Sequence, residues 1–456
     1  MANTTSPFAD PAPVVHTVPA LPGALPLIGD VLRFRSDRLG LHEEAARFAP
    51  ITRLKLLNIA VYVVTDADAA KEILVDNADK FLKAAGIQQL APVLGNGLLN
   101  AEGEVHKKHR KLLAPAFAPK RMNAYAEVMI EETRTQVASW TPGKRVDLSH
   151  EMMELTLAIA GKTMFGADVR KNARTVGEAL DLAMRAVITG ITSPFQLDYK
   201  WPLPRHLQMR KAVKMLDEIV YKMIADGRKA GTDRGDVLSV LLAARDEEDG
   251  SGLDDRQVRD EVMTLLLAGH ETTANALTWT FYELGKNPAA LAKLEEEIAR
   301  VIGDRQITPD DLQNMPYNLG VIEETMRLHP PAYLIGRQAA EDVVIAGHKF
   351  PRRSILLVNT RGIQRRPDYW PAPFAFKPER MFAEQKKARP RHQYMPFGAG
   401  PRVCIGSHFA LLEAQFLLAT MIQRAKVQTL STHVEPEPLV TLRPRGGLPA
   451  IVGPKS

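Results

Sequence analysis

The one cysteine of this 456-residue chain, Cys404, constrains the chain more than any other feature. It lies in the run Phe-Gly-Ala-Gly-Pro-Arg-Val-Cys-Ile-Gly, directly before an apolar stretch with helical periodicity. A lone cysteine forms neither an internal disulfide nor a zinc site of several thiolates. Arg402 and the N-terminus of a helix expected from Cys404 to about Lys426 would both favour the thiolate. The loop therefore predicts a single thiolate ligand rather than a small buried hydrophobic residue.

Haem iron fits a single thiolate best, because an axial thiolate donates electron density that favours O–O cleavage. Gly400 and Gly406 would let the backbone approach such a bulky group. The loop matches every specified position of F-x-x-G-x-R-x-C-x-G and so resembles the haem-binding signature of the cytochrome P450 family. By this resemblance several loop residues contact haem, with the cysteine as iron ligand: Phe397, Gly398, Arg402, Cys404, Gly406 and His408.

The resemblance implies a mainly α-helical fold with a small β-sheet region, in which haem lies between a long oxygen-side helix and the helix that carries the cysteine. Helical periodicity supports this fold class. Helices are expected over residues 41–48, 67–77, 103–114, 121–139, 152–163, 172–191, 207–230, 236–247, 254–286, 288–302 and 317–329. Alternating apolar residues predict strands at 51–56, 60–64 and 354–358, of which the first two make a hairpin.

The longest expected helix, 254–286, carries Ala-Gly-His-Glu-Thr-Thr, which matches the family's [AG]-G-x-[DE]-T-[TS]. Mostly small residues share one of its faces: Leu265, Ala268, Gly269, Thr272 and Ala276. Their size leaves room for a flat macrocycle and dioxygen, so Ala268 and Gly269 are predicted haem contacts. Glu271 and Thr272 place an acid beside an alcohol and are predicted to relay protons during oxygen activation. Thr272 is also expected to bond to a carbonyl one turn earlier.

Three further motifs stand where the family has them. Glu324-x-x-Arg327 matches E-x-x-R, and Lys-Pro-Glu-Arg-Met-Phe resembles P-E-R-F with methionine in place of phenylalanine. The resemblance implies a buried structural network of Glu324, Arg327 and Arg380. His106 and Arg110 match W-x-x-x-R, with histidine in place of tryptophan. They are spaced one helical turn apart and are expected to donate to the haem propionates.

Arg337 matches a third propionate-binding position of the family. The resemblance implies substrate contacts from residues 83–99, from parts of 186–201 and from a set of apolar positions: Leu265, Ala268, Ala332, Leu334, Ile335 and Leu442. Because these segments are mostly apolar, an apolar small molecule is the expected substrate. Fatty acid, terpenoid, steroid and polyketide classes remain open.

The composition indicates a soluble globular protein, with 45% apolar and 25% charged residues. The net charge of +6 is too small to indicate nucleic-acid binding. Neither a signal peptide nor a membrane anchor is expected, and the single cysteine suits the cytoplasm. We expect a flexible tail at 1–18 and one haem domain at 19–456.

The family resemblance predicts a monooxygenase that takes dioxygen and electrons derived from NAD(P)H and holds haem b. No reductase segment is expected within the chain, so a ferredoxin or flavodoxin with its reductase would supply the electrons. Basic residues at 107–111 and 386–391 are the expected docking site. A peroxide-driven or isomerising enzyme of the same fold is an alternative, and a non-catalytic haem-thiolate sensor is a further one.

Overall fold

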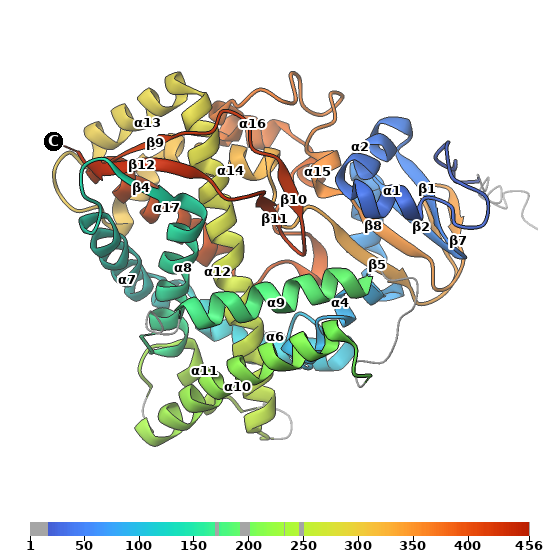
Figure 1. Cartoon of the computed structure of the whole chain (residues 1–456), viewed down its shortest axis with the longest axis horizontal. Coiled ribbons are helices and arrows are strands. Elements are labelled where there is room, and N and C mark those ends of the chain that lie inside the picture. Colours follow the sequence, from blue (N-terminus) through green and yellow to red (C-terminus); the bar gives the residue numbers. More distant parts are fainter. Residues whose placement is uncertain (1–16, 169–172, 192–200, 232, 246–249, 456) are drawn as a thin grey trace, which may run out of the picture.

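The computed structural model describes residues 17–168, 173–191, 201–231, 233–245 and 250–455. Helices dominate this part of the chain, which confirms the mainly α-helical fold class (Figure 1). The helices are α1 (Val31–Ser36), α2 (Arg38–Phe48), α3 (Ala67–Lys71), α4 (Ala85–Gln88), α5 (Ala91–Leu94), α6 (Gly103–Leu113), α7 (Pro119–Ala138), α8 (Leu148–Phe165), α9 (Ala173–Ile191), α10 (Pro204–Ala230), α11 (Val237–Ala243), α12 (Asp255–Lys286), α13 (Pro288–Val301), α14 (Pro316–Leu328), α15 (Thr360–Ile363), α16 (Ala383–Ala388) and α17 (Ser407–Arg424).

The strands are short and form small sheets. They are β1 (Ile51–Leu56), β2 (Ile59–Val64), β3 (Phe81–Lys83), β4 (Lys144–Asp147), β5 (Ile335–Ala339), β6 (Val343–Ile345), β7 (His348–Phe350), β8 (Ile355–Val358), β9 (Ala425–Thr429), β10 (Pro436–Pro438), β11 (Leu442–Pro444) and β12 (Pro449–Pro454). The five-stranded sheet has the order β1-β2-β8-β5-β3, and β4-β12-β9 form a second sheet. Figure 1 shows the larger sheet beside α1 and α2 at one end of the molecule, and the smaller one near the C-terminus at the other.

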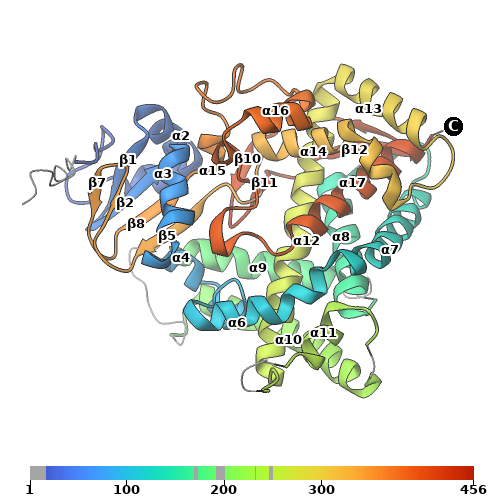
Figure 2. The same cartoon turned by 180° about the vertical axis from the view of Figure 1, so that it is seen from behind.

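The long helix α12 runs through the middle of the helical part and packs against α8, α10, α14 and α17 (Figure 2). A capping box starts it, because Asp254 accepts from the Gln257 backbone and the Gln257 side chain accepts in return. From Val258 to Leu284, a stretch that the structure describes completely, every residue is buried except three. These are Ala268, Gly269 and Thr272, which we call the accessible window. A helix packed on all sides is thus open only at its centre.

Most expected elements are confirmed, and some differ in extent. The helix after the cysteine begins at Ser407 rather than at Cys404, with Gly406 at its N-cap. The segment expected to be one helix at 67–77 is the α-helix α3 followed by a π-helical turn at Glu72–Asp76. The helix expected at 236–247 is the shorter α11, and residues 246–249 lie outside the described part. Residues 1–16 and 192–200, which carry parts of the predicted tail and substrate segment, also lie outside it.

None of the helices in the described ranges combines the length and apolar composition needed to cross a lipid bilayer.

Candidate active site

The cysteine loop is folded tightly on its own backbone. The Cys404 N–H donates to the Phe397 carbonyl (3.0 Å), and Arg110 on α6 donates to the Val403 carbonyl (2.7 Å). Gly400 has a φ of +73°, and a Cβ there would lie 1.9 Å from the Leu74 carbonyl oxygen. Gly400 is therefore required by packing of the loop on the π-helical turn, rather than by approach of a bulky group as its sequence position suggested.

The Cys404 thiol is accessible to water, yet protein surrounds it closely enough for burial to dominate its ionisation. Burial raises the pKa of Cys404, while the Gly406 N–H and the charge of Arg110 act in the opposite direction. The protein surroundings alone thus do not favour the thiolate, contrary to the expectation from sequence. The Arg402 guanidinium instead donates to the Ala78 and Phe81 carbonyls (both 2.9 Å). A thiolate here relies on the positive charge of a bound metal.

The accessible window of α12 supplies a second surface of the site. The loop that carries Cys404 lies beside the middle of α12 in both views (Figures 1 and 2), and α17 contacts α12. Thr272 Oγ1 donates to the Ala268 carbonyl (2.7 Å), the backbone bond expected from the sequence. A Cβ at Gly269 would lie 3.0 Å from Met164 Cε, so this position is tight toward α8. Ala268 is the most accessible of the three residues, and none of the three places a large side chain at the centre of α12.

The Glu271 side chain points in a different direction from that of its neighbour Thr272. Its carboxylate Oε1 accepts from Arg443 Nε (2.9 Å) and from the Thr441 hydroxyl, both in the segment of β10 and β11. Successive residues of a helix point about 100° apart, so Glu271 and Thr272 leave α12 in different directions. His270 points into the core, where burial lowers its pKa. Glu271 and Thr272 are thus adjacent in sequence, but the Glu271 carboxylate is bound by the segment of β10 and β11.

Buried cations gather beside the loop. Lys83 on β3 and Arg337 on β5 are direct cross-strand partners, an arrangement of like charges that is unfavourable without an anion. Burial, with mutual repulsion among the cations, lowers the pKa of Lys83 to about 8, of Arg337 to about 10 and of His106 to about 4. Glu102 balances part of the charge through a 3.0 Å ion pair with Arg402.

This cluster fits a dianionic group such as the two propionates of haem. Arg337 Nε is buried and has no hydrogen-bond partner among the described residues. An orphaned guanidinium nitrogen between other cations is suited to an anionic ligand. Sequence reasoning identified His106, Arg110, Arg337 and Arg402 but not Lys83 as a cation of this site. The only signal for Lys83 is its register opposite Arg337, which the sequence does not reveal.

The residues Glu324, Arg327 and Arg380 lie together. Arg327 binds both carboxylate oxygens of Glu324 (2.8 Å each), and both side chains are fully buried. Arg327 also donates to the Gln364 and Pro373 carbonyls. Arg380 Nε lies 3.7 Å from Glu324 Oε1. The cluster joins α14 to the irregular segment before the cysteine loop, so it shapes the backbone behind the site without reaching it.

The predicted substrate positions divide into two groups. Ala332, Leu334 and Ile335 are accessible, and a Cβ on Gly398 of the loop would lie 3.6 Å from Ile335 Cδ1. Leu442 has no accessible surface and packs within the core, so its burial gives the prediction of a pocket residue no support. Leu265, at 6% exposure, is nearly as buried.

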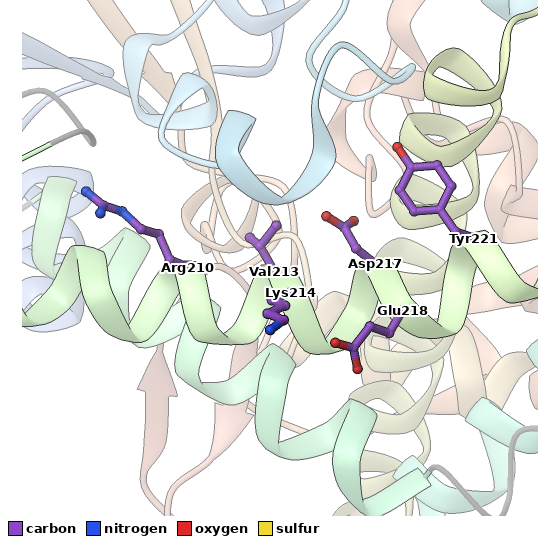
Figure 3. A pocket seen from close by; sticks show the side chains of 6 residues that line it. All are labelled: Arg210, Val213, Lys214, Asp217, Glu218 and Tyr221. Carbon is purple, nitrogen blue, oxygen red and sulfur yellow. The ribbon is translucent and has the colours of Figure 1, made fainter.

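An open groove of about 500 Å³ lies elsewhere, along α10. Figure 3 shows Arg210, Val213, Asp217 and Tyr221 along this side of the helix. Asp217 is already paired with Arg259 Nη2 (2.6 Å). The groove mixes charges of both signs and contains none of the residues of the cysteine loop or the accessible window, so we assign it no role in the chemistry.

Comparison with known proteins agrees with this geometry. The family model described as cytochrome P450 matches residues 19–448. The chain is 35% identical to cyclooctatin synthase of Streptomyces melanosporofaciens, over 94% of this chain and 93% of the relative. It is 32% identical to cyclooctat-9-en-7-ol 5-monooxygenase of the same organism, over 96% of each chain. Pentalenene oxygenase of Streptomyces avermitilis is 29% identical, over 89% of this chain and 90% of the relative. The chain therefore belongs to the cytochrome P450 family, and it is an oxygenating oxidoreductase that uses haem and dioxygen.

Proposed function

We propose that this monooxygenase holds haem b, with Cys404 as the iron ligand and buried cations as partners of the propionates. The cations are Lys83, Arg110, Arg337 and Arg402, joined by His106 as a neutral donor. The observation that carries the proposal is that the loop of the exposed Cys404 lies beside the middle of α12, where Ala268, Gly269 and Thr272 are accessible (Figures 1 and 2). When bound, haem supplies dioxygen binding and O–O cleavage, so that one oxygen atom enters the substrate.

The chain's own residues would orient the substrate and move protons. Thr272 presents a hydroxyl at the accessible window, and its bond to the Ala268 carbonyl fixes the position of Oγ1. Ala268 and Gly269 leave space for substrate, and Ala332, Leu334 and Ile335 add apolar walls. Both Glu271 and Thr272 are present, which favours dioxygen over peroxide as the oxidant, because peroxide chemistry needs no proton relay of this kind.

We propose a cyclic terpenoid alkene or alkenol as the substrate. Two relatives are named for oxygenation of pentalenene and of cyclooctat-9-en-7-ol. The accessible side chains of the site are apolar apart from that of Thr272, which suits a compact carbocycle that offers little to hydrogen-bond. A compact ring system also loses less conformational freedom on binding than a linear chain of similar size.

Optical titration of the ferric protein tests this substrate class. Cyclic terpenoid alkenes and alkenols should displace iron-bound water, shift the Soret band to shorter wavelength, and give monohydroxylated or epoxidised products with dioxygen and reductant. Linear fatty acids of equal carbon number serve as the control and should bind more weakly. Tighter binding and turnover of the fatty acids would contradict the substrate proposal. Product formation with peroxide but not with dioxygen and reductant would contradict the choice of oxidant.

We further propose that a ferredoxin or flavodoxin delivers electrons that originate from NAD(P)H. Figure 2 shows α6 below and α16 above the loop that leads into α17. Several of the cations expected at the docking site are engaged within the protein. Lys107 pairs with Glu104 (2.7 Å) and Lys386 with Glu323 (2.5 Å), while Arg389 lies over the Trp370 ring. The exposed Lys387 and Arg391 are better placed for an acidic partner.

Reduction by such a partner should slow as salt rises, because ions screen charges beyond about 8 Å at physiological strength. Lys387→Glu should slow the reduction at low salt by roughly tenfold, and Lys222→Glu on α10 should leave it unchanged. Lys222 is a matched control, because it is an exposed lysine on α10 and pairs with Asp226. Stopped-flow reduction that is insensitive to both salt and Lys387→Glu would place docking elsewhere. The cytoplasmic location expected from the sequence stays a prediction.

A further inference from the structure

Glu271 is held by the C-terminal hairpin of β10 and β11. Its Oε1 accepts from Arg443 Nε and Nη2 (2.9 Å each) and from the Thr441 hydroxyl. Asn275, one turn further along α12, donates to the same Thr441 hydroxyl (3.1 Å). The Glu271 side chain is 3% exposed and that of Arg443 is 17% exposed. Because Glu271 Oε1 accepts from these donors, a proton that Glu271 is to deliver must first reach its carboxylate.

The same guanidinium binds a second carboxylate. Arg443 Nη1 lies 3.2 Å from Asp181 Oδ1 on α9, and Asp181 Oδ2 accepts from Arg185 Nε (2.8 Å). Exposure rises outward along this row, from 39% at Asp181 to 57% at Arg185. Glu437 on β10 acts on Arg185 from the hairpin side. Charges of alternating sign therefore run from the buried acid of α12 to the surface between α9 and the hairpin.

We propose that Arg443 and Asp181 are positioning residues that let Glu271 take up and release a proton. This inference rests on the proposed function. Arginine keeps its proton in proteins, so Arg443 cannot itself pass one on. When Glu271 is neutral, the positive charge of Arg443 is still balanced by Asp181, so a buried cation is not left unpaired. Glu271 then takes one proton from hydronium in the solvent, leaving water, and gives it to Thr272 Oγ1 as that hydroxyl releases its own proton toward the dioxygen site. Each group ends as it began, and no electron is transferred.

Asp181 is the more sensitive test of this arrangement. In Asp181→Asn the guanidinium keeps only Glu271 as its anion, so the ion pair tightens and proton uptake by Glu271 becomes harder. The ratio of oxygenated product to released hydrogen peroxide should fall by about tenfold or more, with an increased solvent isotope effect on product formation. Asp181→Glu should restore both. Asp226→Asn, which alters an exposed i,i+4 pair on α10, is the control.

Arg443→Met tests the holding of Glu271 without any turnover. Without the guanidinium a buried carboxyl favours its neutral form. The ferric, substrate-free variant at neutral pH should then show the infrared C=O band of a protonated carboxylic acid. Wild type shows such a band from Glu413, whose pKa burial raises to about 8. The expected result is therefore an additional band in Arg443→Met, which Glu271→Gln in the Arg443→Met background should remove. Arg445→Met is the matched control, because Arg445 is an exposed arginine of the same segment that pairs with Glu435.

The proposal requires both results. A wild-type product-to-peroxide ratio in Asp181→Asn overturns it, and so does the absence of an additional carboxylic acid band from Arg443→Met. Carbon monoxide difference spectra of each variant establish that the folded haem protein is being compared. Failure of the proposed function would look different, because the wild-type protein itself would give no oxygenated product whereas the infrared result would be unaffected.

Discussion

Replacing Cys404 by serine should abolish the strongly red-shifted Soret band that the reduced wild-type protein shows with carbon monoxide. Serine has nearly the size of cysteine, but its hydroxyl does not ionise at neutral pH and is a poor ligand for iron. Burial already raises the pKa of the Cys404 thiol, so the site offers a hydroxyl still less help toward an anion. Monooxygenase turnover should fall below detection, because the electron donation that favours O–O cleavage is lost.

Haem content separates loss of the ligand from loss of the cofactor. Lys83, Arg337 and Arg110 lie on β3, β5 and α6 rather than on the cysteine loop, so Cys404→Ser should retain a substantial part of its haem. Haem is measured independently by extraction with pyridine, and circular dichroism follows folding. A variant that keeps the red-shifted band at wild-type haem content would show that Cys404 is not the iron ligand.

The fold was predictable where local pattern decides it. The long helices and the β1–β2 hairpin follow from periodicity within one segment, and the hairpin pairs Ile51 with Val64. Strands β4 and β12 were missed because each is short and they pair across about three hundred residues. Strands β3 and β5 join segments about as far apart. Propensity carries no information on such partners. The late start of α17 also depends on tertiary packing, since the cysteine loop is closed by Phe397 and Arg110.

The residues of the site also divide into those that a local motif predicts and those that it does not. The Cys404 loop and the backbone bond of Thr272 lie within single motifs, and the Glu324–Arg327 pair is a one-turn helix contact. Lys83 and Arg443 carry no motif, and each is brought to the site by an element far along the chain. The direction in which a side chain points was the other feature that the sequence did not reveal. The sequence places Glu271 at the site but cannot show that its carboxylate turns toward β11.

Thr272→Ala should uncouple the enzyme. The variant should bind substrate and consume reductant at close to the wild-type rate, yet release hydrogen peroxide in place of most of the product. Removal of one positioned proton donor typically costs about 10²–10⁴-fold in the step it serves. Thr272 is the one hydroxyl of the accessible window, and its Oγ1 is fixed by the Ala268 carbonyl at 2.7 Å. Reductant consumed, peroxide released and product formed are measured in the same reaction.

Thr278→Ala provides a control for the helix itself. Thr278 lies on α12 and also donates to the carbonyl four residues earlier at 2.7 Å, but it is buried and does not reach the accessible window. Its replacement removes the same backbone bond and should lower stability without changing the ratio of product to peroxide. Thr272→Ser retains a hydroxyl and should stay largely coupled. If Thr272→Ala couples reductant to product as well as Thr278→Ala does, Thr272 is a packing residue, and protons reach the oxygen by a route that does not include its hydroxyl.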